Sequence, residues 1–229
     1  MMKNTTTVLS TLMLVLAGPS LAQSSNGVPN SDVDGRPVEA GLYNHLTNAL
    51  ENPKDDPRLP RVLLLGDSIS IGYTVPVRQF LGDKANVHHP PENCQHTAYG
   101  LAHLSRWLGT GKWDVIHFNW GIWDTHYVDR KTGALVLDES KLVPKDMRVR
   151  HTPEQYRQNL TKLVESLQGT GAKLVWASTT PVMFRKGARF EDIAKYNAVA
   201  AEVMKEHGIE IDDLYAFVLP EAANLVFPS

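Results

Sequence analysis

The segment Gly66–Ser70 (GDSIS) places a serine hydroxyl directly after an apolar run, Arg61–Leu65. Such a continuous apolar run is typical of a strand that is buried on both faces. A serine at the carboxyl end of this strand, on a turn into a helix, presents its hydroxyl to the crevice beyond the sheet. Its backbone N–H then lies at a helix N-terminus, where an oxyanion is stabilised. Ser68 is therefore our candidate nucleophile, and the alternative is that Ser68 only caps the next helix.

Further apolar runs alternate with amphipathic segments along the chain. The runs predict strands at Ala85–His88, Trp113–Asn119, Lys173–Ser178 and Ile209–Ile211. Helices are expected at His96–Leu108, from the capping box Thr152–Gln155 to Gly169, and at Glu191–His207. Strands separated by helices of this length predict an α/β fold with a parallel sheet, in which ligands bind beyond the carboxyl ends of the strands.

The strand followed by GDSIS resembles the first block of the SGNH/GDSL hydrolase superfamily, a group of single-domain serine esterases. Asn93–Thr97 stands where the second block of that family places an oxyanion glycine, and Gly121–Asp124 stands where the third block reads G-x-N-D. The resemblance extends over Arg61–Val218. It implies a three-layer α/β/α domain with a mostly parallel, flavodoxin-like sheet, and Ser68 as the nucleophile.

Three residues are candidates for the oxyanion site that this resemblance implies. Gln95 stands where the family has glycine, and a backbone N–H survives that change. Trp123 stands where the family has an asparagine donor, so a nearby amide, Asn93 or Asn119, is expected to replace it, with Asn93 ranked first. For both asparagines the alternative is a turn or strand-end residue that bonds its own backbone.

A serine nucleophile needs a base, which the family supplies from an Asp-x-x-His block near the C-terminus. The literal match Asp114–His117 lies within a predicted strand, where residues three apart point to opposite faces, so these two side chains cannot pair. We expect the base and its carboxylate beyond Ser229, so that the 229-residue chain is inactive until its missing tail is restored. Within the sequence, His126 is the fallback base. His88 and His89 are interpreted as solvated loop residues.

Charge and composition exclude several other functions. Lys+Arg total 23 against Asp+Glu 25, so there is no basic surface for nucleic acid. The single cysteine, Cys94, rules out an internal disulfide, and no group of residues has the spacing of a metal site. We therefore expect neither metal nor cofactor.

The N-terminus has the pattern of a secretory signal over residues 1–22. Lys3 precedes the apolar run Val8–Ala17, which is too short to span a bilayer, and Ser20–Ala22 fits a cleavage site. Residues 23–58 are expected to be a flexible lead-in. Residues 59–229 would then form the hydrolase domain, with an insertion at 127–151 and an incomplete C-terminus. The predicted location is periplasmic or secreted, with no membrane span after the signal is removed.

The sequence thus predicts an exported serine hydrolase that cleaves a carboxylic ester: an O-acetyl sugar, a lipid or a small acyl ester. One alternative is a binding module on the same fold without turnover. The other is a flavodoxin-like nucleotide-binding domain, which is disfavoured because the turn at 66–70 has a single glycine before the helix.

Overall fold

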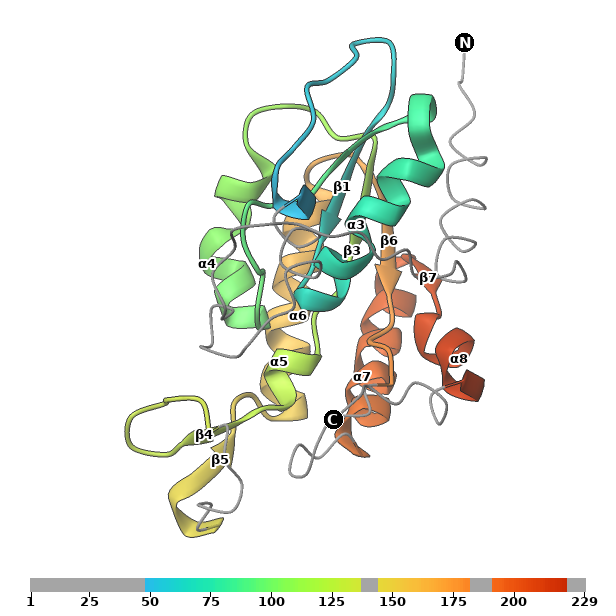
Figure 1. Cartoon of the computed structure of the whole chain (residues 1–229). Coiled ribbons are helices and arrows are strands. Elements are labelled where there is room, and N and C mark those ends of the chain that lie inside the picture. Colours follow the sequence, from blue (N-terminus) through green and yellow to red (C-terminus); the bar gives the residue numbers. More distant parts are fainter. Residues whose placement is uncertain (1–47, 137–143, 182–190, 222–229) are drawn as a thin grey trace, which may run out of the picture.

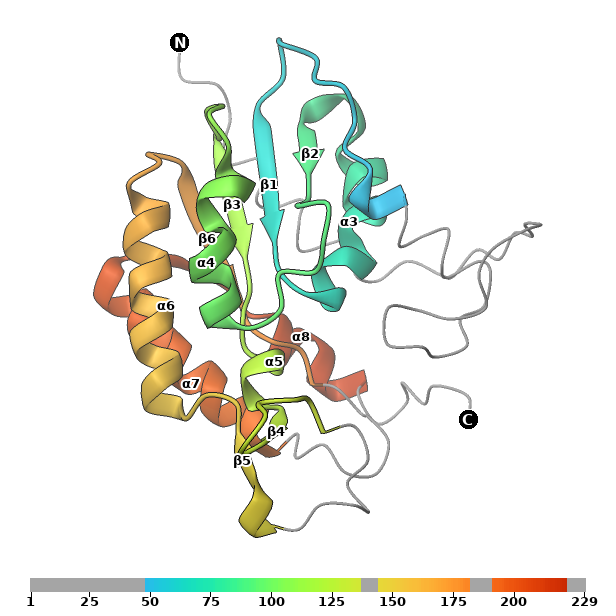
Figure 2. The ribbon, with the colours of Figure 1, turned by 90° about the vertical axis from the view of Figure 1, so that its left-hand side faces the viewer.

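The computed structural model describes residues 48–136, 144–181 and 191–221 of the chain. Its centre is a sheet of five strands (Figure 1). Across the sheet the order is β2 (Asn86–His88), β1 (Arg61–Leu65), β3 (Val115–Phe118), β6 (Lys173–Ala177) and β7 (Glu210–Asp212). Every neighbouring pair is parallel, as Figure 2 shows for β1 and β2. The strands predicted from the sequence are confirmed, with ends that differ by at most two residues.

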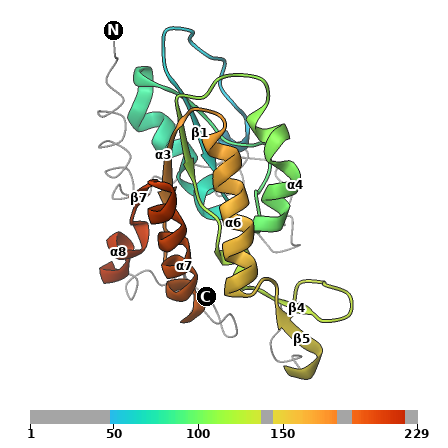
Figure 3. The same cartoon turned by 180° about the vertical axis from the view of Figure 1, so that it is seen from behind.

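Helices cover both faces of this sheet. One face carries α3 (Ser68–Leu81) and α8 (Leu214–Val218), and the other carries α4 (Thr97–Leu108), α6 (Pro153–Gln168) and α7 (Glu191–His207). Figure 3 shows α6 and α7 side by side on the second face. Short 3₁₀ turns are η2 (Gly82–Lys84), η4 (Pro144–Asp146) and η5 (Leu219–Glu221). This arrangement confirms the predicted three-layer α/β/α fold.

Strand β1 contributes side chains to both cores, because successive residues of a strand point to opposite faces. Leu63 and Leu65 pack with the core under α4, α6 and α7, whereas Val62 and Leu64 pack with the core under α3. None of these side chains is more than 1% exposed. Burial of each contributes about 1.5–3 kcal/mol. The strand that leads to Ser68 is therefore held firmly from both sides.

Two sets of hydrogen bonds fix helices of the second face, and the first of them was predicted from the sequence. Thr152 and Gln155 form the reciprocal capping box that begins α6, whose apolar stripe is fully buried. At the end of β6, Thr179 N–H donates to Asn197 Oδ1 at 2.9 Å and Asn197 Nδ2 donates to Thr179 O at 2.9 Å. This pair of hydrogen bonds ties α7 to the carboxyl edge of the sheet.

The carboxyl edge has a topological switch point between β1 and β3. From β1 the chain passes through α3 to β2 on one side, and from β3 it proceeds to β6 and β7 on the other. In open α/β sheets, ligands bind in the crevice outside such a point. Ser68 follows β1, and the short helix α5 (Ile122–Thr125) follows β3, so both lie at this edge of the sheet.

The segment 127–151, which the sequence sets apart, contains a second, two-stranded antiparallel sheet. It consists of β4 (Tyr127–Asp129) and β5 (Met147–Val149) and projects from the end of the molecule where α5 lies (Figures 1 and 3). Arg150 N–H donates to His126 O at 2.8 Å, which closes the base of the projection. No helix in the described part of the chain is long and apolar enough to cross a membrane.

Two glycines in helix interiors allow a matched test of the packing. A Cβ at Gly100 in α4 would lie 2.9 Å from Cζ2 of the fully buried Trp120, whereas a Cβ at Gly72 in α3 would meet nothing within 4 Å. We expect Gly100→Ala to lower the free energy of unfolding by about 1–3 kcal/mol through overpacking. Gly72→Ala should instead raise it by about 0.5–1 kcal/mol, because alanine loses less backbone entropy.

Urea denaturation of the two variants and the wild type measures both effects. Equal stabilities for the two alanine variants would contradict the close approach of Trp120 to α4.

Candidate active site

Ser68 is exposed and is the first residue of α3. Its hydroxyl makes no hydrogen bond with any described residue. The helix is capped by the preceding residue instead, since Asp67 Oδ1 accepts the Ile69 N–H at 2.9 Å. The alternative that Ser68 caps this helix is therefore wrong. The structure exposes the Ser68 hydroxyl at the carboxyl end of β1, next to a helix N-terminus.

The turn before Ser68 has room only for glycine. A Cβ on Gly66 would lie 2.8 Å from Ser70 Oγ, which donates to Asp67 O at 2.8 Å and is buried. The Ser70 side chain therefore packs against this turn and leaves no space for a side chain at position 66.

Asp67 is a buried carboxyl group beside the candidate nucleophile. It is 1% exposed, and no described residue hydrogen-bonds its Oδ2. Burial raises the pKa of Asp67 to about 7, against the hydrogen bond from Ile69, and the negative charge of Asp124 raises it further. The site therefore contains a carboxyl group that changes its charge near neutral pH.

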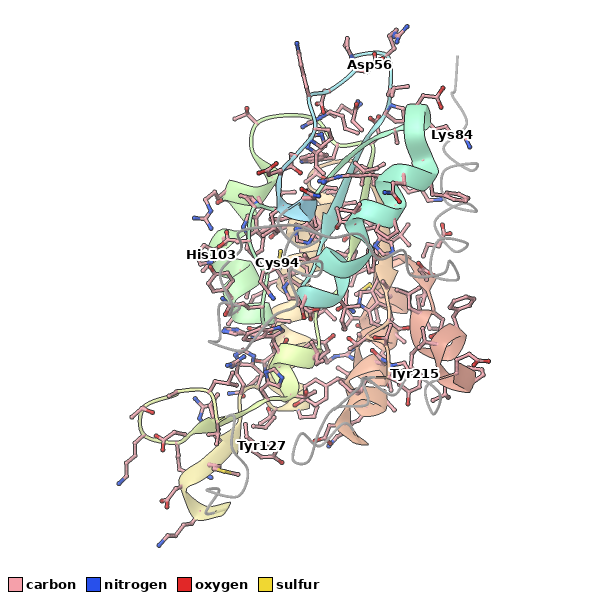
Figure 4. The ribbon with its side chains drawn as sticks, viewed as in Figure 1. Asp56, Lys84, Cys94, His103, Tyr127 and Tyr215 are labelled. Carbon is pink, nitrogen blue, oxygen red and sulfur yellow. The ribbon has the colours of Figure 1, made fainter. Side chains whose placement is uncertain are left out.

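The segment Asn93–Thr97 lies beside the turn that precedes Ser68, because the Cys94 N–H donates to Gly66 O at 3.1 Å. Figure 4 labels Cys94, which is fully buried. Gln95 follows with a φ of 47°, the one positive φ at a non-glycine among the described residues. The backbone therefore keeps the left-handed conformation that glycine adopts at lowest cost. Its N–H donates to Asn93 Oδ1 at 2.8 Å, so the amide side chain occupies this donor.

Asn119 and Trp123 lie at the end of β3. Asn119 Nδ2 donates to Ala177 O at 2.7 Å and to Thr179 Oγ1 at 3.1 Å, so its amide hydrogens tie β3 to β6. Trp123 lies on α5 and is half-buried, in contrast to the buried Trp120 two residues beyond β3. Asn93 is the candidate amide whose Nδ2 donates to no described residue.

An Asp–His pair that the sequence reasoning missed lies at the same edge. His151 Nδ1 is 2.6 Å from Asp124 Oδ1, and Asp124 is fully buried. Asp124 also accepts hydrogen bonds from the N–H and hydroxyl of Thr97 at the start of α4. The ring of His96, the N-cap of α4, is 5.1 Å from that of His151. One feature of the sequence indicated the position of His151. It directly precedes the capping box Thr152–Gln155, with which α6 begins.

The remaining histidines have other surroundings. His126, the fallback base, caps α5 with its ring 5.3 Å from that of Trp123. His117 is 1% exposed under α3, and its Nε2 lies 3.1 Å from Asp212 Oδ2 and not beside Asp114. The rejection of Asp114–His117 as a pair is confirmed.

His88 and His89 are not solvated loop residues, so that interpretation is wrong. His88 ends β2, and its Nε2 lies 2.5 Å from Asp55 Oδ1. His89 is fully buried, with Nε2 2.7 Å from Ser70 Oγ. Burial lowers the pKa of His89 to about 4. This Ser–His contact is closed off from the crevice and supports the turn below Ser68.

Within the described residues, no three His, Cys, Asp or Glu side chains gather in a way that could hold a metal ion. The described groups at the start of α3 are an exposed serine hydroxyl, the buried carboxyl group of Asp67 and backbone N–H groups.

No family model matches the chain, and no curated protein matches its sequence. Solved structures do match, and they include an acetyl xylan esterase, AlAXEase, at 13% identity and a TM-score of 0.55, over 72% of this chain and 82% of that one. The lipase/acylhydrolase from Enterococcus faecalis is 18% identical at a TM-score of 0.55, over 73% and 84%. Axe2, an acetylxylan esterase from Geobacillus stearothermophilus, is 15% identical at 0.54, over 74% and 82%.

The chain has the SGNH hydrolase fold. The resemblance stated from the GDSIS segment is thereby confirmed at the level of fold. In the SGNH fold of this chain, Ser68 and the Cys94–His96 segment follow β1 and β2, and α5 follows β3.

The raised pKa of Asp67 makes the stability of the protein depend on pH. The folded state holds this proton between pH 3.8 and about 7, where the unfolded chain has lost it. Stability from this group is therefore fully present below pH 3.8 and declines as the pH rises to about 7, with a limiting slope of ~1.4 kcal/mol per pH unit. We expect Asp67→Asn, which keeps the capping oxygen, to remove that decline.

Urea denaturation at pH 5, 6, 7 and 8 tests this expectation, with the exposed Asp83→Asn as the control. The stability of Asp67→Asn relative to wild type should increase with pH, whereas Asp83→Asn should follow the wild type. A constant difference across the series would refute the buried, protonated carboxyl group.

Proposed function

We propose that the chain is a serine ester hydrolase in which Ser68 attacks the acyl carbonyl. The observation that carries this proposal is the exposed Ser68 hydroxyl at the first residue of α3, beside the switch point of the sheet. The structural likeness to esterases and acylhydrolases supports an ester substrate. An O-acetyl sugar, a lipid ester and a small acyl ester all fit this reaction class, and no cofactor is needed.

The tetrahedral intermediate carries an oxyanion that requires N–H donors. Asp67 caps Ile69 and leaves the Ser68 N–H unengaged by described residues, at the positive end of α3. The second proposed donor is the Gln95 N–H, with Asn93 Nδ2 beside it. Because Asn93 Oδ1 now accepts from Gln95 N–H, we propose that this amide turns aside when the oxyanion forms.

The proton of Ser68 must pass to a base, since an alcohol is a poor nucleophile. Among the described residues His126 remains the fallback base, because it follows α5 at the carboxyl edge of the sheet. No described imidazole hydrogen-bonds the Ser68 hydroxyl in this structure. That observation favours the second candidate function, a binding module on the same fold without turnover.

Substitution of the nucleophile separates the two candidates. In the full-length protein, we expect Ser68→Ala to lower the hydrolysis of p-nitrophenyl acetate by at least ~10³-fold, as removal of a catalytic serine does in other hydrolases. The fold should persist, because the hydroxyl of Ser68 has no partner among the described residues.

The matched control is Ser70→Ala in the same segment. Ser70 is buried against His89, so this variant should lose stability and retain ester turnover per folded molecule. Turnover that Ser68→Ala leaves intact would exclude Ser68, and a full-length wild-type protein without turnover or fluorophosphonate labelling would favour the binding module.

We also propose that the protein is exported and cut after Ala22, on the pattern of Lys3, Val8–Ala17 and Ser20–Ala22. These residues lie outside the described part of the chain. Intact-mass measurement of exported protein should show a chain that begins at Gln23. Exported protein that still carries residues 1–22 would contradict the cleavage.

A further inference from the structure

A cavity of about 590 Å³ lies beside the edge strand β2, and the residues that line it do not include Ser68. It extends from Arg61, the first residue of β1, to the segment 88–92 at the end of β2, and Trp107 of α4 bounds it. Figure 2 shows that α4 and α6 lie over β3 and β6, whereas none of the described helices covers β2 on this side. Because small-molecule pockets measure about 300–1,000 Å³, the cavity is large enough for a small organic ligand.

Asp55 connects two groups of the cavity wall. Its Oδ2 accepts from Arg61 Nε at 2.7 Å, and its Oδ1 lies 2.5 Å from His88 Nε2. Arg61 Cζ lies 3.9 Å from the centre of the Trp113 ring, and Arg61 Nη1 donates to Lys112 O at 3.0 Å. Arg61 Nη2 donates to no described residue. The guanidinium group is therefore held beside His88 with N–H donors that remain available to a ligand.

The second carboxylate of the wall, Glu92, is also bonded at both oxygens. Oε1 accepts from Trp107 Nε1 at 2.7 Å and from the Arg106 guanidinium, and Oε2 accepts from the Tyr99 hydroxyl at 2.8 Å. Arg106 donates to no other described residue, and its side chain is 61% exposed. The carboxylate oxygens of the wall are thus occupied, whereas both guanidinium groups retain N–H donors. Such a wall favours a ligand that supplies acceptors, and above all an anion.

His88 adds a titratable nitrogen to this wall. The residue is 8% exposed, and its ring meets that of Trp113 edge to face. Because the Asp55 carboxylate accepts at Nε2, the hydrogen of the neutral ring is on Nε2 and Nδ1 is an acceptor. Nδ1 is accessible and hydrogen-bonds no described residue. Burial lowers the pKa of His88, against the hydrogen bond with Asp55, so the ring is mostly neutral at pH 7.

We propose that this cavity binds a small organic carboxylate with an aromatic or short aliphatic body. The carboxylate lies between Arg61 and His88, which Asp55 holds next to each other. It accepts from the free N–H groups of Arg61 and from His88 Nδ1, which takes up a proton from solvent as the ligand binds. Asp55 stabilises the resulting imidazolium from the Nε2 side, and Arg106 adds a second positive charge at the cavity.

The remaining wall of the cavity suits the apolar body of such a ligand. Leu63, Leu108 and Trp107 line it, together with Pro90 and Pro91. An aromatic ring in contact with these side chains removes apolar surface from water. Acetate and inorganic phosphate have no ring to bury, so benzoate should bind more tightly than either of them.

The proton on His88 makes the affinity depend on pH. The charged and titratable groups around His88 are Asp55, Arg61, Arg78, His89, Glu92 and Arg106. Burial lowers the pKa of His89 to about 4, so this ring stays neutral, and the arginines stay charged. The bound anion raises the pKa of His88 above its value in the free protein. Affinity is therefore highest at low pH, and Kd for benzoate should increase from pH 5.5 to pH 8.

NMR titration of the full chain with benzoate at pH 6 measures this binding. The indole N–H signals of Trp107 and Trp113, which line the cavity, should shift, and that of the buried Trp176 should not. Benzamide, a neutral molecule of nearly the same shape, should leave all three signals in place. Absence of the two shifts, or equal affinities for benzoate and benzamide, would overturn the proposal.

Two substitutions in the wall test the residues that hold the anion. His88→Gln keeps a donor to Asp55 at the Nε2 position and removes Nδ1, so Kd at pH 6 should rise about 10-fold and lose its pH dependence. Arg106→Gln should raise Kd about 3-fold through the lost positive charge. The control is Arg157→Gln, which also removes an arginine from ion pairs with glutamates, Glu202 and Glu206, and should leave Kd unchanged. An unchanged Kd in both wall variants would refute the anion site.

The cavity site does not depend on the proposed hydrolysis, and one further variant separates the two. Ser68→Ala should leave Kd for benzoate at the wild-type value, because Ser68 does not line the cavity. A higher Kd in this variant would place benzoate at Ser68 and would reject the cavity as its site.

Discussion

The buried carboxylate of Asp124 holds together the segments from which the site is built. It lies on α5, accepts from the backbone and hydroxyl of Thr97 at the start of α4, and orients His151 at the end of 127–151. Removal of one partner of such a buried charge is costly, because the other group is left without compensation. The positions of α4, α5 and the 127–151 segment are therefore coupled through a single side chain.

A second buried carboxyl group, Asp67, is close enough to Asp124 for the negative charge of Asp124 to raise its pKa. Two carboxylates in one poorly solvated region repel each other, and the less well paired one keeps its proton to a higher pH. Asp124 has several donors, whereas Asp67 has one hydrogen bond, from Ile69, and a bare Oδ2. Burial is thus the main cause that raises the pKa of Asp67, and the negative charge of Asp124 adds to it.

Several polar groups near the crevice are occupied in maintaining the backbone. Asn119 joins β3 to β6, and Ser70 and His89 support the turn beneath Ser68. Groups that satisfy buried backbone atoms are poorly placed to meet a substrate, since their release leaves unpaired donors or acceptors. Ser68 differs from these groups, because its hydroxyl has no hydrogen-bond partner among the described residues.

Local patterns in the sequence determined the strands, the helices and the position of Ser68. The run Arg61–Leu65 and the capping box at Thr152 act through burial and hydrogen bonds between near neighbours, which are visible in a single stretch of chain. The left-handed backbone at Gln95 was not predicted, although the family resemblance places glycine at this position. Only the tertiary structure decided that Asp124 selects His151, 27 residues away, and that His89 is buried against Ser70. Those pairings depend on which loops the sheet brings to one edge and on which groups lose their water, and neither property is encoded in local spacing.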